Sequence, residues 1–484
     1  MADERFEEHL RAPRGHVPAG AHHGAAGGAV CGDLVRVSVA VEGDRVVDAG
    51  CDASGCGAAL AAASAAVELV RGAPVLEAAR VSAQAIADEL GGLSPGKRHA
   101  ADLASDALHR ALGAAVRADG AAPLDPGRVL VAMSGGVDSA VAALRSGPNA
   151  VAVTLELWSS PENDAERSCC SADAVRHARM LAHRMGLPHL TIDLRDEFRA
   201  GVVEPWLADH AAGLTPNPCV RCNGSVRLDA MLDVAARVGA PALATGHYAR
   251  VGDDGLLRIA ADAAKDQSYM LAAVPPAVLA RLRFPLGELT KAEVRALAEE
   301  AGLPVARKPD SQDLCFLAGT GRAEFLARHG GQRAHPGDLV DTAGRTLGRH
   351  RGQALYTVGQ RKGLGLGGTG TPRYVVAKDA ARNVVVVGTR EDLLVRRVPL
   401  RDVRLHRPAE DVRTVRLRYH APAIPCRLDG DAVELEEPFA GAAPGQTAVL
   451  MAGDTVVGHA TIAELRVSPH RDSRGPADVR AGRA

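Results

Sequence analysis

The segment whose residues are most clearly suited to ligand binding or catalysis begins where an apolar run, Val129–Met133, ends. Such a run is typical of a buried strand. The next residues, Ser134 to Ser139, read SGGVDS, and an alanine-rich helical pattern, Ala140–Leu144, follows them. Glycine lets a backbone approach a ligand closely because it has no Cβ, and a helix N-terminus offers unpaired N–H groups and a positive dipole end. The segment therefore predicts an anion site, suited to phosphate; the alternative is an ordinary turn between a core strand and a core helix.

Two further segments combine thiols with prolines and polar residues. Cys219 and Cys222 form a C-x-x-C pair, and Cys315 follows the polar run Asp310–Asp313. A C-x-x-C pair can be a disulfide couple, half of a zinc site or two ligands of an iron–sulfur cluster. The sequence shows no second pair to complete a zinc site, whereas Cys315 could be the third ligand of a cluster. Arg221 beside Cys222 would instead favour a reactive thiolate.

Composition narrows the class of protein. The chain has 484 residues, which suggests about three or four domains. Its formal net charge is −1, so any nucleic-acid binding must depend on local basic patches. Nine cysteines in so long a chain indicate cytoplasmic thiols with redox or metal chemistry rather than a disulfide scaffold. The acidic N-terminus lacks a following apolar stretch, and no apolar run approaches about 18 residues, so we expect neither a secretory signal nor a membrane span.

The elements that must position these residues fall into several domains. From Arg128 to Leu317, β-type runs alternate with helical patterns, which predicts a doubly wound parallel sheet. Ligands of such sheets bind beyond the carboxyl ends of the strands, where Ser134 and the Thr245–His247 run would lie. Strands followed by helices predict an α+β domain before this sheet, and short strands predict a small central domain and an antiparallel β-barrel after it. The expected boundaries are 1–117, a linker at 118–127, then 128–318, 319–394, 395–466 and a polar, disordered tail at 467–484.

The SGGVDS segment resembles the PP-loop of ATP pyrophosphatases, which cleave ATP between its α and β phosphates. It lacks the lysine of a Walker A loop. Together with further segments in this order, it resembles the bacterial tRNA 2-thiouridylases (the MnmA family) over residues 128–465. The matching stretches are 132–139, 169–171, 216–223, 244–248, 265–269, 284–290, 310–316, 356–363 and 417–420.

This resemblance implies a tRNA-uridine 2-sulfurtransferase that uses ATP and Mg²⁺. ATP would adenylate the 2-carbonyl oxygen of the wobble uridine in tRNA, and sulfur would then displace AMP. Cys315 would carry a persulfide, with Cys222 as its partner thiol or as the attacking group. Some family members have an acidic residue at the position of Cys219, and the cysteine here keeps open a [4Fe–4S] cluster held by Cys219, Cys222 and Cys315 that carries sulfide. A non-catalytic iron–sulfur carrier is the third alternative.

The resemblance also implies binding residues for both substrates. The target base must leave the anticodon stack to be reached, and Arg361 and Lys362 add local positive charge for tRNA. The implied ATP site comprises Ala132, Met133, Ser134, Gly135, Gly136, Val137, Asp138, Ser139, Leu155 and Gly246. The implied tRNA contacts are Asn217, Pro218, Cys219, His247, Lys265, Asp266, Gln267, Gln360, Arg418 and Tyr419.

The first part of the chain, from residue 27 to about 115, resembles an iron–sulfur scaffold of the IscU/NifU N-terminal type. The matching stretches are 29–33, 55–57 and 99–104. The resemblance implies zinc or a labile iron–sulfur cluster at Cys31, Asp33, Cys56 and His99. The third scaffold cysteine is replaced by Ala100, and Cys51 is a substitute ligand to consider. The alternatives are a docking module for a cysteine desulfurase or a sulfur-relay protein, and a purely structural role.

Overall fold

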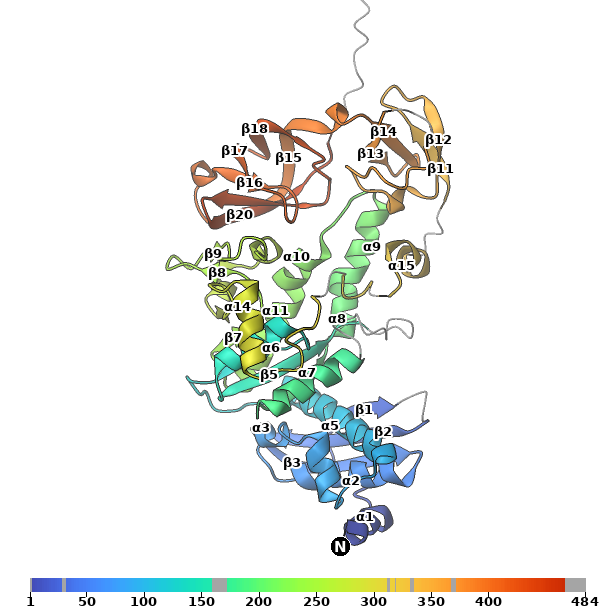
Figure 1. Cartoon of the computed structure of the whole chain (residues 1–484), viewed down its shortest axis with the longest axis vertical. Coiled ribbons are helices and arrows are strands. Elements are labelled where there is room, and N and C mark those ends of the chain that lie inside the picture. Colours follow the sequence, from blue (N-terminus) through green and yellow to red (C-terminus); the bar gives the residue numbers. More distant parts are fainter. Residues whose placement is uncertain are drawn as a thin grey trace, which may run out of the picture. The chain divides into compact units, whose positions relative to one another are not determined.

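The computed structural model describes residues 2–27, 32–158, 172–310, 314–317, 319–330, 335–366 and 371–465 (Figure 1). The chain divides into two compact units. The first comprises residues 1–205, 218–321 and 454–457, and the second comprises 206–217, 322–453 and 458–484. The expected disordered tail lies outside the described residues, as do Cys31, Cys169 and Cys170. None of the described helices is long and apolar enough to cross a membrane.

The first unit begins with an α+β domain. Its antiparallel sheet has the order β1-β2-β3, with β1 at His22–Gly27, β2 at Leu34–Glu42 and β3 at Arg45–Ser54. The long helix α5, Arg98–Asp119, packs on β1 and β2, and α2, Gly57–Val70, packs on β3. Small alanine side chains fill most of the contact face of α2, which lets this helix lie close to the sheet. The remaining helices are α1 (Ala2–Arg11), α3 (Val75–Ala78), α4 (Ala83–Glu89) and η1 (Pro95–Lys97).

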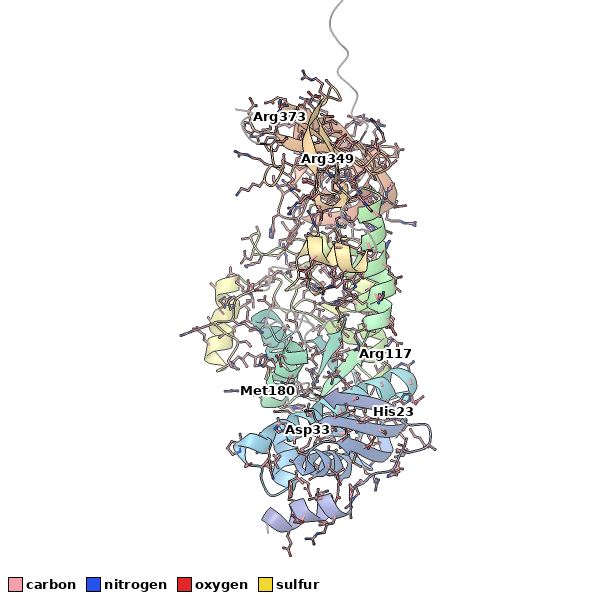
Figure 2. The ribbon with its side chains drawn as sticks, turned by 90° about the vertical axis from the view of Figure 1, so that its right-hand side faces the viewer. His23, Asp33, Arg117, Met180, Arg349 and Arg373 are labelled. Carbon is pink, nitrogen blue, oxygen red and sulfur yellow. The ribbon has the colours of Figure 1, made fainter. Side chains whose placement is uncertain are left out.

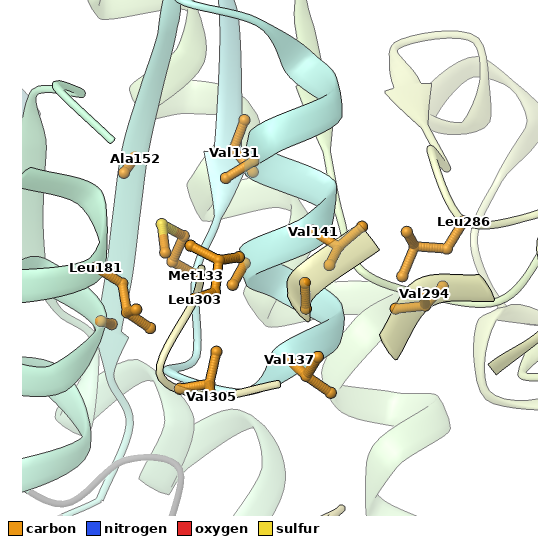
Figure 3. Close-up of a cluster of buried hydrophobic side chains, with 14 of the residues drawn as sticks. Val131, Met133, Val137, Val141, Ala152, Leu181, Leu286, Val294, Leu303 and Val305 are labelled. Carbon is orange, nitrogen blue, oxygen red and sulfur yellow. The ribbon is translucent and has the colours of Figure 1, made fainter. Parts of the chain in front are cut away.

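A five-stranded parallel sheet forms the second domain of this unit, with the order β10-β7-β4-β5-β6. Helices cover both faces, so the predicted doubly wound sheet is confirmed. Val131 and Met133 lie in one buried cluster with Val137 and Val141 of α6 and Val294 of α14 (Figure 3). The strands are β4 (Val129–Ala132), β5 (Ala150–Glu156), β6 (His189–Asp193), β7 (Ala242–Ala244) and β10 (Leu282–Arg283). The main helices are α6 (Val137–Ser146), α7 (Ala172–Arg184), α11 (Leu228–Arg237) and α14 (Lys291–Glu300).

Two π-helical turns interrupt the helices that follow β6. The first, η2 at Arg199–Val203, joins α8 (Arg195–Phe198) to α9 (Glu204–Ala211), and the second, η3 at Asn223–Arg227, joins α10 (Pro218–Cys222) to α11. Turns of this kind occur often at functional sites. Through η3, the helical stretch that begins with α10 at Pro218 continues to the end of α11 at Arg237. Short elements complete the domain: β8 (Arg250–Val251), β9 (Leu257–Arg258), α12 (Ser268–Leu271) and α13 (Pro276–Leu279).

The second unit contains a small central sheet and an antiparallel barrel. The sheet order is β12-β11-β14-β13, around a core that includes Leu339, Val375 and Val385. The barrel order is β15-β18-β17-β16-β19-β20, and pairing of β15 with β20 closes it, so the predicted β-barrel is confirmed. Strand β16 is short, because the chain turns soon after Arg416. The helices and strands are α15 (Arg322–His329), β11 (Gly337–Val340), β12 (Thr346–His350), η4 (Gln353–Leu355), β13 (Tyr374–Asp379), β14 (Val384–Gly388), η5 (Glu391–Leu393), β15 (Leu394–Leu405), η6 (Ala409–Asp411), β16 (Thr414–Arg416), β17 (Ile424–Asp429), β18 (Ala432–Ala440), β19 (Thr447–Ala452) and β20 (Thr455–Ile462).

Candidate active site and metal site

The glycine turn after β4 is closed by its own serines. The Ser134 N–H donates to Ser139 Oγ at 3.1 Å, and Ser139 Oγ donates to the Gly136 carbonyl at 3.1 Å. Gly246, after β7, approaches the first turn of α6 so closely that a Cβ on it would lie 2.8 Å from the Ser139 nitrogen. The turn and the end of β7 thus form one cradle at the carboxyl ends of the strands. Of the remaining predicted ATP residues, Met133 and Leu155 are buried.

Asp138, in the first turn of α6, receives two donors from distant parts of the domain. Lys291 Nζ lies 2.6 Å from Asp138 Oδ1, and the Tyr248 hydroxyl donates to the same oxygen at 2.9 Å. Burial and the neighbouring Asp138 raise the pKa of Tyr248, so its hydroxyl stays protonated and donates. Thr290 and Glu293 form a capping box that fixes the start of α14 and hence the place of Lys291.

Asp310 forms a second anionic centre beside the first. Its carboxylate pairs with Lys265 at 2.8 Å, Lys291 at 2.9 Å and Arg295 at 3.2 Å. Burial opposes the charge on Asp310, but the hydrogen bonds from Lys265 and Lys291 outweigh it, and the pKa of Asp310 is lowered. Lys291 bridges the two carboxylates, so the turn of α6 and the residue that begins the Cys315 segment share one cation.

Sequence reasoning missed two lysines at this site. Lys308 Nζ donates to the Gly135 carbonyl at 3.1 Å, and Lys291 is largely buried against Asp138. Ammonium groups held next to a helix N-terminus can move onto a bound phosphate. The only sequence signal was indirect: Lys291 directly follows the segment 284–290 that matches the family.

The thiols of this domain come from two segments, and both segments pack against the continuous stretch formed by α8 and η2. Cys219 and Cys222 are three residues apart on α10, which places them on one face. The Phe316 ring, next to Cys315, packs edge-on against Phe198 at a centroid distance of 5.9 Å. The π-turn η2, which directly follows Phe198, contacts α10. Cys222 is buried, and the other two cysteines are half-buried. In the described part of the chain, the three sulfurs are not among the ligand groups that lie within 4.8 Å of one another.

Several predicted tRNA contacts make internal hydrogen bonds. His247 is half-buried, and its Nδ1 lies 2.8 Å from Thr245 Oγ1. Desolvation and, to a smaller extent, the nearby Arg227 lower its pKa to about 3. Asp266 accepts hydrogen bonds from the Ala260 and Ser268 N–H groups. Gln267 accepts one from the Tyr248 N–H at 3.1 Å, and Lys265 is paired with Asp310 as described. These residues shape the loop beside the cradle, and their contact with tRNA stays a prediction.

The other predicted tRNA residues divide between the units. Pro218 and Cys219 belong to the first unit. Asn217, Gln360, Arg418 and Tyr419 belong to the second. In that unit Gln360 accepts a hydrogen bond from the Thr357 N–H and donates one to the Lys362 carbonyl, which fixes the turn between them. Arg418 is exposed, and the Tyr419 ring lies 3.8 Å from that of His420.

Three predicted metal ligands of the N-terminal domain converge. Asp33, Cys56 and His99 bring one ligand atom each within 4.8 Å of one another. His99 Nε2 lies 3.1 Å from Asp33 Oδ2, and Cys56 Sγ lies 3.3 Å from the same oxygen. The Cys56 N–H, which donates to Asp33 at 2.7 Å, is the main cause of a lowered pKa of Asp33. Asp33, labelled in Figure 2, lies just before β2. A thiolate sulfur, a carboxylate oxygen and an imidazole nitrogen are all common zinc ligands, so this group of side chains fits zinc.

The structure disfavours Cys51 as the substitute ligand. This cysteine is buried in β3, and it is absent from the group formed by Asp33, Cys56 and His99. Burial raises the pKa of the Cys51 thiol to about 11, which opposes the thiolate that a metal needs. The fourth predicted ligand, Cys31, lies outside the described residues.

Comparison with known proteins defines the class. Residues 4–118 match the model of the NifU-like N terminal domain, and residues 127–319 match the tRNA methyl transferase HUP domain. Residues 323–389 match the tRNA methyl transferase PRC-barrel domain, and residues 399–462 match the aminomethyltransferase beta-barrel domain. The molecule is therefore a NifU-like domain fused to a HUP domain and two β domains.

The relatives define the family. The chain is 44% identical over 482 residues to the bifunctional protein NifU/MnmA of Rubrobacter xylanophilus, a match that covers 95% of this chain and 98% of that protein. It is 46% identical over 357 residues to the tRNA-specific 2-thiouridylase MnmA of Acidothermus cellulolyticus, covering 70% of this chain and 98% of that protein. The chain belongs to the MnmA family, with a NifU-like domain at its N-terminus, which confirms both resemblances seen in the sequence.

Proposed function

We propose that the protein catalyses ATP-dependent 2-thiolation of the wobble uridine in tRNA. The observation that supports this most directly is the closed glycine turn, whose α6 terminus and flanking lysines suit a triphosphate. Cys219 and Cys222 lie on α10, which contacts η2, and the segment of Cys315 packs against α8 through Phe316. These half-buried and buried thiols suit sulfur transfer. A tRNA substrate would place the enzyme in the cytoplasm.

In the first half-reaction, the uracil O2 attacks the α-phosphorus of ATP, and pyrophosphate leaves. The N–H groups of the SGGVDS turn would bind the phosphates, and Lys291 and Lys308 would transfer to them from Asp138 and the Gly135 carbonyl. Asp138, once Lys291 has moved, would then be able to hold Mg²⁺, which neutralises phosphate charge when it is bound. Asp310 would lose Lys291 but keep its ion pairs with Lys265 and Arg295, so the residue that begins the Cys315 segment would stay in place.

In the second half-reaction, the terminal sulfur of a persulfide on Cys315 attacks C2 of the adenylated uridine, and AMP leaves with the former carbonyl oxygen. The base is then joined to Cys315 through a disulfide. The Cys222 thiolate attacks the Cys315 sulfur, which releases 2-thiouridine and leaves a Cys222–Cys315 disulfide. An external dithiol must reduce this bond, and a cysteine desulfurase or a sulfur-relay protein must supply the next persulfide sulfur.

An iron–sulfur route is the second candidate, because Cys219 gives the site a third thiol. It would require Cys219, Cys222 and Cys315 to gather around a [4Fe–4S] cluster, which would present sulfide at its open position. Iron and sulfide analysis of anaerobically purified protein distinguishes the routes. Iron that Cys219→Ala removes supports the cluster, and iron retained by this variant points to the N-terminal domain.

For the N-terminal domain, we propose a zinc or labile iron–sulfur site at Cys31, Asp33, Cys56 and His99. The grouping of three of these ligands supports it. A tethered domain of this kind raises the local concentration of stored metal or sulfur near the thiolation site.

The decisive experiment measures pyrophosphate release with and without tRNA. Release that requires tRNA supports adenylation of uridine. Bound iron without pyrophosphate release, whether or not tRNA is present, would favour a non-catalytic iron–sulfur carrier.

A further inference from the structure

Helix α5 of the NifU-like domain also packs on the parallel sheet of the HUP domain. One side of α5 covers β1 and β2, and another lies along β6, the edge strand of the parallel sheet. The two backbones touch at Gly113, where a Cβ would lie only 1.9 Å from the Thr191 carbonyl oxygen. Arg117, labelled in Figure 2, donates to the Asp193 carbonyl at the end of the same strand. The first unit is thus continuous across the two domains.

Asp106 of α5 forms a buried ion pair with α7. Arg179 Nη2 lies 2.5 Å from Asp106 Oδ1, and the two side chains are 3% and 5% exposed. Arg176 approaches the other carboxylate oxygen at 3.5 Å. The first turn of α7 lies against the glycine turn, since a Cβ on Gly135 would be 3.1 Å from the Ala174 carbonyl oxygen. Asp106 therefore anchors the helix that supports the predicted phosphate site.

Arg110, one helical turn further along α5, holds the end of β5. Its Nη2 donates to Glu156 Oε1 at 2.6 Å, and its Nε donates to Oε1 and Oε2 at 3.0 and 3.2 Å. Glu156 is the last residue of β5 and follows Leu155 of the predicted ATP site. Arg110 Nη1 also donates to the Ala25 carbonyl of β1 at 3.0 Å. One guanidinium thus connects the strand that leads to Cys31 with the strand that ends at the nucleotide site.

We propose that Asp106 and Arg110 are positioning residues for adenylation, so that the NifU-like domain forms part of the framework of the ATP site. This inference rests on the proposed function. Neither residue is placed to touch the nucleotide. Each fixes an element that does, and a small displacement of a binding element is enough to weaken substrate binding strongly. The NifU-like domain then has two roles: it stores metal or sulfur through His99 at the start of α5, and it shapes the ATP site through the next turns of the same helix.

The test compares full-length Arg110→Gln, Glu156→Gln, the double variant and Asp106→Asn with wild type. KM for ATP and kcat are measured in tRNA-dependent pyrophosphate release, and equilibrium binding of radiolabelled ATP is measured without tRNA. We expect Arg110→Gln to raise KM and the ATP dissociation constant about tenfold, with kcat changed by less than about threefold. Arg110→Lys, which keeps the charge, should recover part of the affinity. The effects of Arg110→Gln and Glu156→Gln should not add in the double variant.

Arg71→Gln is the matched control. This arginine belongs to the same domain and donates to the Ala49 carbonyl, but these bonds remain within the NifU-like domain. It should leave both ATP constants unchanged. If Arg110→Gln lowers the unfolding temperature, the uncharged double variant provides the comparison, because it leaves no unpaired buried charge. ATP affinities within twofold of wild type in all four variants would overturn the inference. Absence of pyrophosphate release by the wild type would overturn the proposed function instead, and the binding assay would still test the positioning residues.

Discussion

We assign sulfur or metal chemistry to cysteines in two regions of the molecule, and the two regions are organised differently. In the NifU-like domain, Asp33, Cys56 and His99 already lie within 4.8 Å of one another. In the HUP domain, Cys222 and Cys315 come from segments far apart in the chain and rest on one support, without such a grouping among the described residues. A preformed set of donors suits storage of a metal or of sulfur. Two thiols on different segments suit a reaction in which one carries a persulfide and the other attacks it.

Replacing either thiol of the HUP domain should give the largest effect. Cys222→Ala or Cys315→Ala removes a sulfur that the second half-reaction requires, so 2-thiouridine formation should fall by at least about 10³-fold. Pyrophosphate release with tRNA should continue, because adenylation uses neither thiol. Mass spectrometry of tRNA nucleosides and a pyrophosphate assay measure the two steps. Cys426→Ala, in the barrel, is the control and should retain both activities. Product formation by Cys222→Ala at the wild-type rate would show that the thiols do not work as a pair.

The lysines at the glycine turn should give the next largest effect. Lys291→Met removes the cation that faces Asp138 and Asp310, and tRNA-dependent pyrophosphate release should fall roughly 10²-fold, as when one preorganised donor is lost. Metal content of the NifU-like domain should not change. Lys97→Met, on the surface of that domain, is the control. An unaltered rate in Lys291→Met would show that this lysine belongs only to the internal ion-pair network.

The proposed metal site at Asp33, Cys56 and His99 is tested by measuring its affinity for zinc. Asp33→Ala removes the ligand that contacts both Cys56 and His99, so zinc affinity should fall by at least about 10- to 100-fold. Zinc remaining after dialysis, measured by elemental analysis, reports this loss. The Cys222→Ala protein should keep its zinc, and so should Asp48→Asn, a substitution in β3 of a half-buried aspartate that is not among the three ligands. If Asp33→Ala retained zinc as the wild type does, the three side chains would be an ordinary hydrogen-bonded cluster.

The junction of the two regions should respond to mild acid through its stability, with no direct effect on either reaction. His109, His183 and His189 lie together between α5, α7 and β6. Burial lowers the pKa of His183 to about 4 and holds the pKa values of the other two well below the usual range. Below the unfolded-state pKa of about 6.5 the unfolded chain therefore binds more protons, and stability is lost as the pH falls from about 6.5 toward 4. Each histidine contributes about 1.4 kcal/mol per pH unit to the slope.

Chemical denaturation at several pH values measures this slope. His183→Gln should flatten it, because glutamine does not titrate. A slope in His183→Gln equal to that of the wild type would show that His183 does not contribute.

The sequence predicted those features of the site that are formed by residues close to one another in the chain. The SGGVDS run predicted the glycine turn between a strand and a helix, and the C-x-x-C spacing singled out Cys219 and Cys222 as a pair. The Asp33, Cys56 and His99 grouping followed from the family resemblance, since these residues are far apart in the chain.

The missed features depend on tertiary contacts. Strand β1, with the sequence HHGAAG, lacks the β-branched residues that favour strands, and it forms because α5 and β2 cover it. Lys291, Lys308 and Asp310 could be assigned to the site only from the folded structure, in which their segments lie beside the glycine turn. Asp106 and Arg110 look like ordinary charges of an amphipathic helix, and their partners, Arg179 and Glu156, are many residues away.

The most direct measurement is a single-turnover reaction of persulfide-loaded protein with ATP and tRNA, without reductant. Proteolysis and mass spectrometry then quantify the peptide that links Cys222 to Cys315, and nucleoside analysis quantifies 2-thiouridine. If the two thiols act on one activated uridine, the disulfide and the modified base should form in equal amounts and at equal rates. Full conversion to 2-thiouridine with both cysteines still free would contradict this mechanism.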